Sequence, residues 1–182
     1  MECLGVLKSL WEQPHAHFEG SYWNLAGEQM YPKPIQTPHP PIWIGGIHPN
    51  VLRRSAKYGD GWMGNGNSST SQFLSQVEIL KQALDEEGRD PNNFQISKRV
   101  YIAVDNDEAT AKRRMADYFW SHYGVTEERA GEVSISGNPE RCVELLSDVI
   151  SAGAQMLMLN PAYDYPEQME ILADEVIPNL NV

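Results

Sequence analysis

The sequence predicts an α/β fold built on a largely parallel sheet. Short apolar segments alternate four times with segments of helical periodicity between residue 41 and residue 182. Glycines follow the first two apolar segments, as they do where a strand turns tightly into a helix. The composition, with 41% hydrophobic and 21% charged residues, is that of an ordinary globular protein. Because a helix follows each strand, the predicted units are βα units, whose strands pair in parallel.

Residues 1–41 precede this alternation. Apolar residues at helical spacing predict an amphipathic helix over residues 2–12, namely Leu4, Leu7, Leu10 and Trp11. Aromatic residues around Gly20 predict a short hairpin over residues 18–26. Five prolines between residues 32 and 41 forbid a helix and predict a long, extended and ordered loop.

The first two βα units come next. Residues 41–44 predict a short strand that ends at Gly45–Gly46, and residues 49–58 predict a helix. Residues 61–63 predict the second strand. Ser69 and Gln72 have the spacing of a capping box, which predicts the start of a helix that Gly88 ends.

The last two units follow the same order. Residues 100–104 are β-branched and aromatic and predict the third strand. Asp105 and Glu108 predict the cap of the next helix, and Trp120 is expected on its apolar face at a core position. Asn138 followed by proline predicts the start of a helix that Gly153 stops. Residues 156–159 predict the last strand and residues 169–180 the last helix. Four parallel strands form either a small open sheet or half of an eight-stranded barrel.

The charge balance excludes some classes of partner. Lys and Arg number 14 and Asp and Glu number 25, which gives a net charge of −11. Such acidity argues against nucleic acid or an anionic membrane surface as the main partner. The longest apolar run is well short of the roughly 18 residues that a membrane helix needs. The first residues lack the basic region and apolar stretch of a signal peptide, so we expect a cytoplasmic protein.

The cysteines and histidines predict no metal site. Cys3 and Cys142 are too few for a disulfide framework or a four-cysteine zinc site, and we expect both to be buried thiols. The five histidines have none of the spacings of a zinc site. We therefore expect no metal.

The strongest motif is the segment between the first predicted strand and its helix. Gly45 and Gly46 would let a ligand approach the backbone closely, and the helix after them would direct its N–H groups toward that point, which suits a phosphate. His48 and Asn50 could each add a side-chain donor, and Ile47 lies between. The alternative is a tight turn that requires glycine for its backbone alone.

A second motif follows the second predicted strand. Trp62 and Met63 lead into a segment of glycine and asparagine that includes Asn65 and runs to residue 67. A flexible polar segment at the carboxyl end of a parallel strand is a common ligand-binding position in α/β proteins. An ordinary surface loop explains the pattern equally well.

Taken together, the motifs resemble one family, the luciferase-like monooxygenases. The resemblance depends on these segments: Phe18-Glu19-Gly20 with Tyr22, Pro32-Lys33-Pro34-Ile35-Gln36, Pro40-Pro41-Ile42-Trp43-Ile44-Gly45-Gly46, Arg54 to Ala56, Asp60-Gly61-Trp62, Gly88-Arg89-Asp90-Pro91 and Glu175-Val176-Ile177-Pro178. It implies a (β/α)8 barrel of the TIM type, of which this chain holds the carboxyl-terminal half with about the last four βα units. It also implies one luciferase-like domain over residues 1–182, with the four units in residues 42–182.

The resemblance carries a cofactor with it. Members of the family use a flavin such as FMN or the deazaflavin coenzyme F420. It implies that Gly45, Gly46, Ile47, His48 and Asn50 contact the phosphate or ribityl part of that cofactor. Trp62 and Asn65, after the next strand, would line the same cleft. The half-barrel that is not in this chain supplies much of the ring pocket in the family, so no catalytic residue is assigned.

Three functions remain open from the sequence. The first is a flavin- or deazaflavin-dependent oxidoreductase or monooxygenase that acts on a small-molecule substrate. The second is a non-catalytic half-barrel, a fragment or split subunit, that covers its open sides by self-association into a homo-oligomer. The third is a small phosphate-binding module that uses Gly45 and Gly46 alone.

Overall fold

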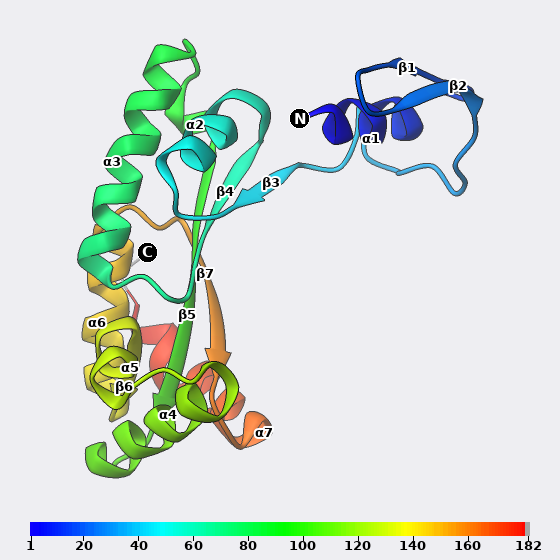
Figure 1. Cartoon of the computed structure of the whole chain (residues 1–182). Helices are drawn as coiled ribbons and strands as arrows, with labels where there is room; N and C mark the ends of the chain where they lie inside the picture. The colour runs from blue at the N-terminus through cyan, green and yellow to red at the C-terminus, as the bar shows by residue number, and fades with distance from the viewer. Residues whose placement is uncertain (181–182) are drawn as a thin grey trace. The chain divides into compact units, whose positions relative to one another are not determined.

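The computed structural model describes residues 1–180 and divides into two compact units, residues 1–42 and residues 43 onward. Each unit has its own secondary structure (Figure 1). A single domain over residues 1–182 stays a prediction.

The first unit holds a helix and a hairpin, as predicted. Helix α1 spans Glu2–Glu12, and strands β1 (Ala16–Glu19) and β2 (Asn24–Glu28) pair antiparallel. The Ser9 hydroxyl on α1 donates to the carbonyl of His17 at 3.0 Å and accepts from its N–H at 3.1 Å. The Glu2 carboxylate accepts from the N–H groups of Tyr22 and Ser21, which lowers the pKa of Glu2. These bonds attach the hairpin to the helix.

The second unit contains the predicted parallel sheet. Strands β3 (Trp43–Gly45), β4 (Gly61–Gly64), β5 (Gln95–Val104) and β7 (Met156–Pro161) pair in that order, each parallel to its neighbour. The four predicted strands are therefore confirmed. Strand β5 begins five residues before the predicted start, at Gln95, because polar side chains over residues 95–99 conceal its first half in the sequence.

A fifth strand was missed. Strand β6 (Ser134–Gly137) follows a short helix α5 (Glu127–Val133) that was also missed, and it pairs parallel with β5 over residues 101–104. Strand β7 pairs with β5 over residues 97–102, so β4 and β6 share the opposite edge of β5, one after the other. The sequence Ser-Ile-Ser-Gly offers one apolar residue, too few for a strand pattern.

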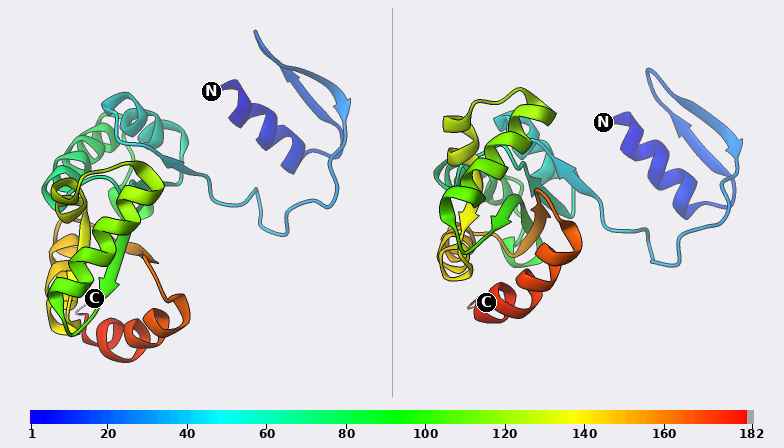
Figure 2. Two further views of the ribbon diagram at one scale, coloured as in Figure 1. Left: turned by 60° about the horizontal axis from the view of Figure 1, so that its bottom comes forward. Right: turned by 90° about the horizontal axis from the view of Figure 1, so that it is seen from below.

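Helices cover one face of the sheet (Figures 1 and 2). They are α2 (Pro49–Tyr58), α3 (Thr70–Glu86) and α6 (Pro139–Ser151), with α7 (Tyr165–Ile171) continued by helical turns over Leu172–Val176 and Ile177–Asn179. The main core joins these helices to the even-numbered residues of β5, such as Ile96, Val100 and Ile102. Ser69 and Gln72 form the predicted capping box of α3.

The other face of the sheet carries the alternate strand residues. Helix α4 (Glu108–Tyr123) packs on its end at Tyr101 and Ala103, and no helix covers the rest of this face among the described residues. Met63, Ser97 and Arg99 belong to this face, and Met156 and Met158 on β7 remain 50% and 46% exposed. In a closed (β/α)8 barrel this face is the packed interior. A parallel sheet with one face only partly covered, and with unpaired edges on β3, β6 and β7 among the described residues, is therefore half of such a barrel.

Helix α4 (Glu108–Tyr123) differs in detail from the prediction. Its N-cap is Asp107, whose carboxylate accepts from the N–H of Ala109, rather than Asp105. Trp120 is 67% exposed, and Ala111, Met115 and Phe119 form the buried face instead. The prediction placed Trp120 on the wrong side because the helix packs through a narrow stripe of smaller residues.

Two smaller features complete the unit. Cys142 is buried, and burial raises its pKa to about 12, whereas Cys3 is exposed, contrary to the expectation for it. Arg89, in the turn after α3, donates to the carbonyls of Ala56 and Gly59 at 2.7 and 2.6 Å and so satisfies the end of α2. Among residues 1–180, no helix is both long enough and apolar enough to cross a membrane.

Candidate functional site

The Gly45–Gly46 turn lies at the carboxyl end of β3, beside β4. Gly45 pairs with Met63 and is exposed. Gly46 has φ +134°, and a Cβ at this position would lie 2.9 Å from a methyl group of Val51 on α2. Both the backbone angle and the space at Gly46 therefore require glycine. The turn is a place where a ligand can reach the backbone.

The N-terminus of α2 is already partly capped. His48 is the N-cap, and its Nδ1 accepts from the N–H of Asn50 at 3.1 Å. The carbonyl of His48 accepts from Val51 at 2.7 Å, and Pro49 has no N–H to offer. Within residues 1–180 the N–H groups of Ile47 and His48 donate to no protein acceptor. An anion here would therefore bind to this segment and not to the first turn of the helix.

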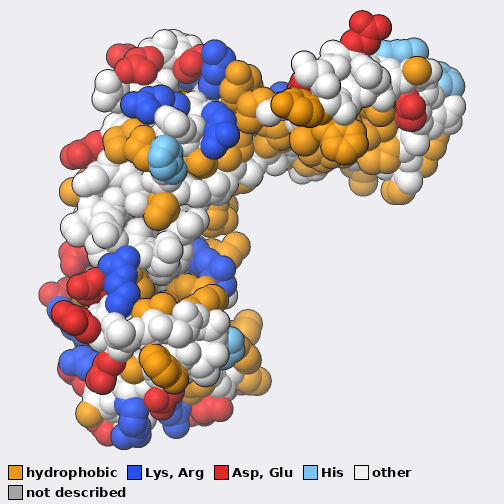
Figure 3. Space-filling view, viewed as in Figure 1, with side chains coloured by type: hydrophobic (Ala, Val, Ile, Leu, Met, Phe, Trp, Pro, Cys, Tyr) orange, Lys and Arg blue, Asp and Glu red, His pale blue; other side chains and the backbone are white. Residues whose placement is uncertain are grey.

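Positive charge borders the same turn. Arg53 donates to the side-chain oxygen of Asn50 at 3.3 Å, and Arg54 donates to its carbonyl at 3.1 Å. Figure 3 shows Lys and Arg side chains gathered over α2. Because Nδ1 of His48 accepts a bond, its Nε2 carries the proton and is a further donor.

Trp62 contacts the turn from the buried side. Its side chain is 0% exposed and stacks on Phe73 of α3 with ring centroids 5.5 Å apart. Its Nε1 donates to the carbonyl of Gly46 at 2.8 Å. Trp62 therefore lies on the helix-covered face, and a role in the site would be exerted through Gly46.

The second motif forms the edge of a cavity of about 470 Å³. The backbone of residues 64–67 makes one side, and strands β5 and β7 and helix α4 make the others. The lining side chains are mostly apolar or aromatic: Met63, Tyr101, Phe119, Tyr123, Val125 and Met158, with Asn65, Asn67 and Arg99 as polar members. The structure thus brings Asn65 to a cavity that begins at Met63, the partner of Gly45.

Arg99 and two tyrosines form the polar part of this cavity. The Arg99 Nε donates to the side-chain oxygen of Asn160 at 2.9 Å, and its guanidinium lies 4.7 Å from the centre of the Tyr101 ring. The hydroxyls of Tyr101 and Tyr123 are 2.7 Å apart. Burial raises the pKa of Tyr101, so its phenol stays neutral. A Cβ at Gly66 would lie 2.5 Å from this ring, so glycine is required there.

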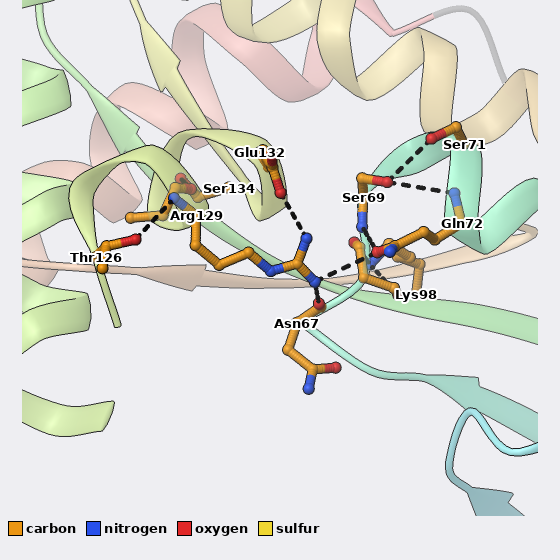
Figure 4. A network of polar contacts seen from close by, with 11 residues as sticks. Asn67, Ser69, Ser71, Gln72, Lys98, Thr126, Arg129, Glu132 and Ser134 are labelled. Carbon is orange, nitrogen blue, oxygen red and sulfur yellow. Dashed lines mark hydrogen bonds and ion pairs between the residues drawn. The ribbon is translucent and has the colours of Figure 1, made fainter. Parts of the chain in front are cut away.

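Lys98 and Arg129 donate hydrogen bonds to the backbone carbonyls of segment 65–68 (Figure 4). Lys98 on β5 donates to the carbonyls of Asn65 and Ser68 at 2.7 and 2.9 Å. Arg129 on α5 donates to the carbonyl of Asn67 at 2.6 Å and forms an ion pair with Glu132 at 2.7 Å. Lys98 is 3% exposed, and desolvation lowers its pKa to about 8. These hydrogen bonds to the carbonyl groups of segment 65–68 fix the position of the edge of the cavity.

Sequence reasoning missed Arg99, Tyr101, Lys98 and Arg129. The sequence predicts Tyr101 as a strand residue but starts that strand at residue 100. With the strand beginning at Gln95, Arg99 and Tyr101 lie two residues apart and therefore on one face. Arg129 lies on a helix that the sequence pattern did not reveal. No group of three or more potential metal ligands occurs among the described residues 1–180.

Comparisons with known proteins agree with this geometry. The model of the luciferase-like monooxygenase family matches residues 1–156. An F420-dependent glucose-6-phosphate dehydrogenase of Kineococcus radiotolerans is 29% identical over 135 residues, which cover 72% of this chain and 38% of the relative. An F420-dependent hydroxymycolic acid dehydrogenase of Mycobacterium tuberculosis is 23% identical over 198 residues, with 99% and 53% covered.

Solved structures show the same fold. An F420-dependent secondary alcohol dehydrogenase with an F420–acetone adduct superposes with a TM-score of 0.86 at 20% identity and covers 100% of this chain and 61% of its own. The oxygenating constituent of 3,6-diketocamphane monooxygenase from Pseudomonas putida, in complex with FMN, gives 0.70 at 17% identity, with 98% and 62% covered. The chain thus spans 38% to 62% of the length of the proteins named here.

The family model matches most of the chain, and the parallel half-barrel superposes on part of the solved structures named above. The chain therefore belongs to the luciferase-like monooxygenase family.

Proposed function

We propose that this chain is the carboxyl-terminal part of an oxidoreductase that uses coenzyme F420 or FMN on a small-molecule substrate. The relatives named above are F420-dependent dehydrogenases, and one of the structural neighbours contains FMN. The observation that carries the proposal is the Gly45–Gly46 turn, exposed at Gly45 and half-buried at Gly46, beside an apolar cavity at the same edge of the sheet.

The residues present fit an anionic cofactor tail at that turn. The free N–H groups of Ile47 and His48, Nε2 of His48 and the amide of Asn50 would surround it, with Arg53 and Arg54 adding positive charge. The apolar cavity beside the turn would exclude water from the reacting groups. When bound, a deazaflavin exchanges a hydride with substrate, and a reduced flavin transfers one oxygen atom from O2.

Binding of the cofactor tests this function directly. We expect coenzyme F420 or FMN to bind the purified chain, measured by fluorescence titration, and Gly46→Ala to weaken binding at least about tenfold because the new Cβ would push on Val51. Gly88→Ala is the control. Gly88 also has a positive φ, +64°, but a Cβ there meets nothing within 4 Å. Equal affinity in all three proteins, or no binding of either cofactor, would argue against the proposal.

A second candidate is a half-barrel that self-associates without catalysis. Met156 and Met158 expose apolar surface on the part of the sheet face that α4 leaves uncovered, and β3 and β7 have unpaired edges among the described residues. Parallel sheets are almost always covered on both faces. A second copy of the chain would cover this face.

The oligomeric state tests the second candidate. We expect the purified chain to elute as a dimer or larger species in size-exclusion chromatography with light scattering. Met156→Glu should shift it toward monomer, because a carboxylate in an apolar interface is costly to desolvate. Met169→Glu, at a 63% exposed position on α7, is the matched control and should leave the elution unchanged. A wild-type chain that elutes as a monomer at all concentrations would exclude self-association.

A further inference from the structure

We propose that the cavity beside segment 64–67 binds an organic anion, a carboxylate or phosphate on an apolar body of ring size, and that Arg99 holds the anionic group. That this ligand is the substrate rests on the proposed function. The binding site itself stands on the geometry of the second unit.

Two neighbouring residues hold the Arg99 side chain in place. Its Nε donates a hydrogen bond to the side-chain oxygen of Asn160 at 2.9 Å, and its guanidinium stacks on the Tyr101 ring. These two contacts set the position of the guanidinium. Among residues 1–180, neither of its two terminal nitrogens has a hydrogen-bond or ion-pair partner. A guanidinium that is oriented but leaves both terminal nitrogens free presents parallel donors that match a carboxylate or phosphate.

No acidic residue of the cavity lining competes with a ligand for Arg99. The residues that line the cavity include no Asp and no Glu, although the chain as a whole has 25 acidic residues. Among the described residues Arg99 also forms no ion pair. Its charge is available to a ligand and not neutralised by the protein.

The other residues of the cavity lining indicate the chemistry of the rest of the ligand. The lining besides Arg99 includes the rings of Phe119 and Tyr123 and the side chains of Met63 and Met158. The Tyr101 and Tyr123 hydroxyls bond to each other, so the polar side chains left in the lining besides Arg99 are those of Asn65 and Asn67. A cavity of about 470 Å³ takes a ring or a short branched chain. These walls favour an apolar body over a sugar.

Binding of simple probes tests the proposal by isothermal titration calorimetry. We expect benzoate and phenyl phosphate to bind, and benzyl alcohol, which has the same ring without the charge, to bind at least about tenfold more weakly. Arg99→Met should weaken the two anions about 10- to 100-fold and leave benzyl alcohol unchanged. Arg99→Lys should recover part of the affinity because it keeps the charge but not the paired donors.

Two further variants protect the test against misfolding. Asn160→Asp keeps Arg99 but places a carboxylate beside it, so it should weaken anion binding while the fold is retained. Arg113→Met changes an exposed arginine of α4 outside the cavity lining and should have no effect. The ratio of benzoate to phenyl phosphate affinity identifies which anion the site prefers.

Three results would overturn the inference. They are equal binding of benzoate and benzyl alcohol, binding of glucose-6-phosphate but of neither aromatic anion, and loss of cofactor binding in Arg99→Met with probe binding intact. The last result would assign Arg99 to the cofactor. If the probes bind as expected but no cofactor binds, the proposed function fails and this site stands.

Discussion

Trp62→Ala is expected to lower the free energy of unfolding by about 3–5 kcal/mol, the range for removing a fully buried aromatic side chain. Trp62 is 0% exposed and packs in parallel on Phe73. The indole fills the space between β4 and α3, and alanine would leave a cavity there. Urea denaturation measures the loss.

Trp62→Phe separates packing from the hydrogen bond. Phenylalanine keeps a ring against Phe73 but removes the Nε1 donor, so the carbonyl of Gly46 loses its partner at 2.8 Å. We expect a smaller loss of stability, about 1–3 kcal/mol. We also expect weaker cofactor binding, because Gly46 belongs to the proposed phosphate site.

An exposed tryptophan provides the control for both variants. Trp120 on α4 is 67% exposed, and Trp120→Ala and Trp120→Phe should change stability by no more than about 0.5 kcal/mol. If Trp62→Phe matched wild type in both stability and cofactor affinity, the bond to Gly46 would have no part in shaping the turn.

The elements that the sequence predicted share one property. Each has either an apolar stripe at helical spacing or a local chemical mark, such as the capping box of Ser69 and Gln72 or the glycine pair after β3. Those marks act between near neighbours in the chain, so they can be read without the fold. The parallel pairing then follows from the alternation of strands and helices.

The missed features depend on residues that are far apart in the sequence. Strand β6 is formed by pairing with β5 and not by its own pattern. Arg99 meets Asn160 across 61 residues, and Arg129 meets Asn67 across 62. Trp62 reaches the glycine turn through a bond that only the pairing of β3 with β4 creates. The candidate site was therefore only half visible in the sequence.

Lys98 is expected to make the stability of the protein depend on pH in the alkaline range. It is 3% exposed, and its ammonium group donates to the carbonyls of Asn65 and Ser68; within residues 1–180 it forms no ion pair. Burial lowers its pKa to about 8, from 10.5 in a solvated lysine. Between these two pH values the unfolded chain binds more protons than the folded chain. The free energy of unfolding must therefore rise with pH in that window, and below about pH 8 the full cost of burying the charged group remains.

The size of this effect is on the order of 3 kcal/mol over the full window, since one pKa unit corresponds to about 1.4 kcal/mol. Lys98→Met removes the titrating group and keeps a side chain of similar shape. We expect the stability of wild type relative to Lys98→Met to increase by about 2 kcal/mol between about pH 7 and pH 10. Lys81→Met, at an exposed position on α3, should show no such trend.

The comparison across pH is needed because two terms oppose each other at pH 7. Replacing Lys98 relieves the cost of burying a charge, but it leaves the carbonyls of Asn65 and Ser68 without their donor. A single measurement at neutral pH could therefore give either sign. The slope with pH depends on the proton alone, so a difference between wild type and Lys98→Met that stays constant from pH 7 to 10 would mean that the ammonium group is not desolvated. It would then follow that segment 65–68 opens to solvent and that the hydrogen bonds from Lys98 do not fix the edge of the cavity.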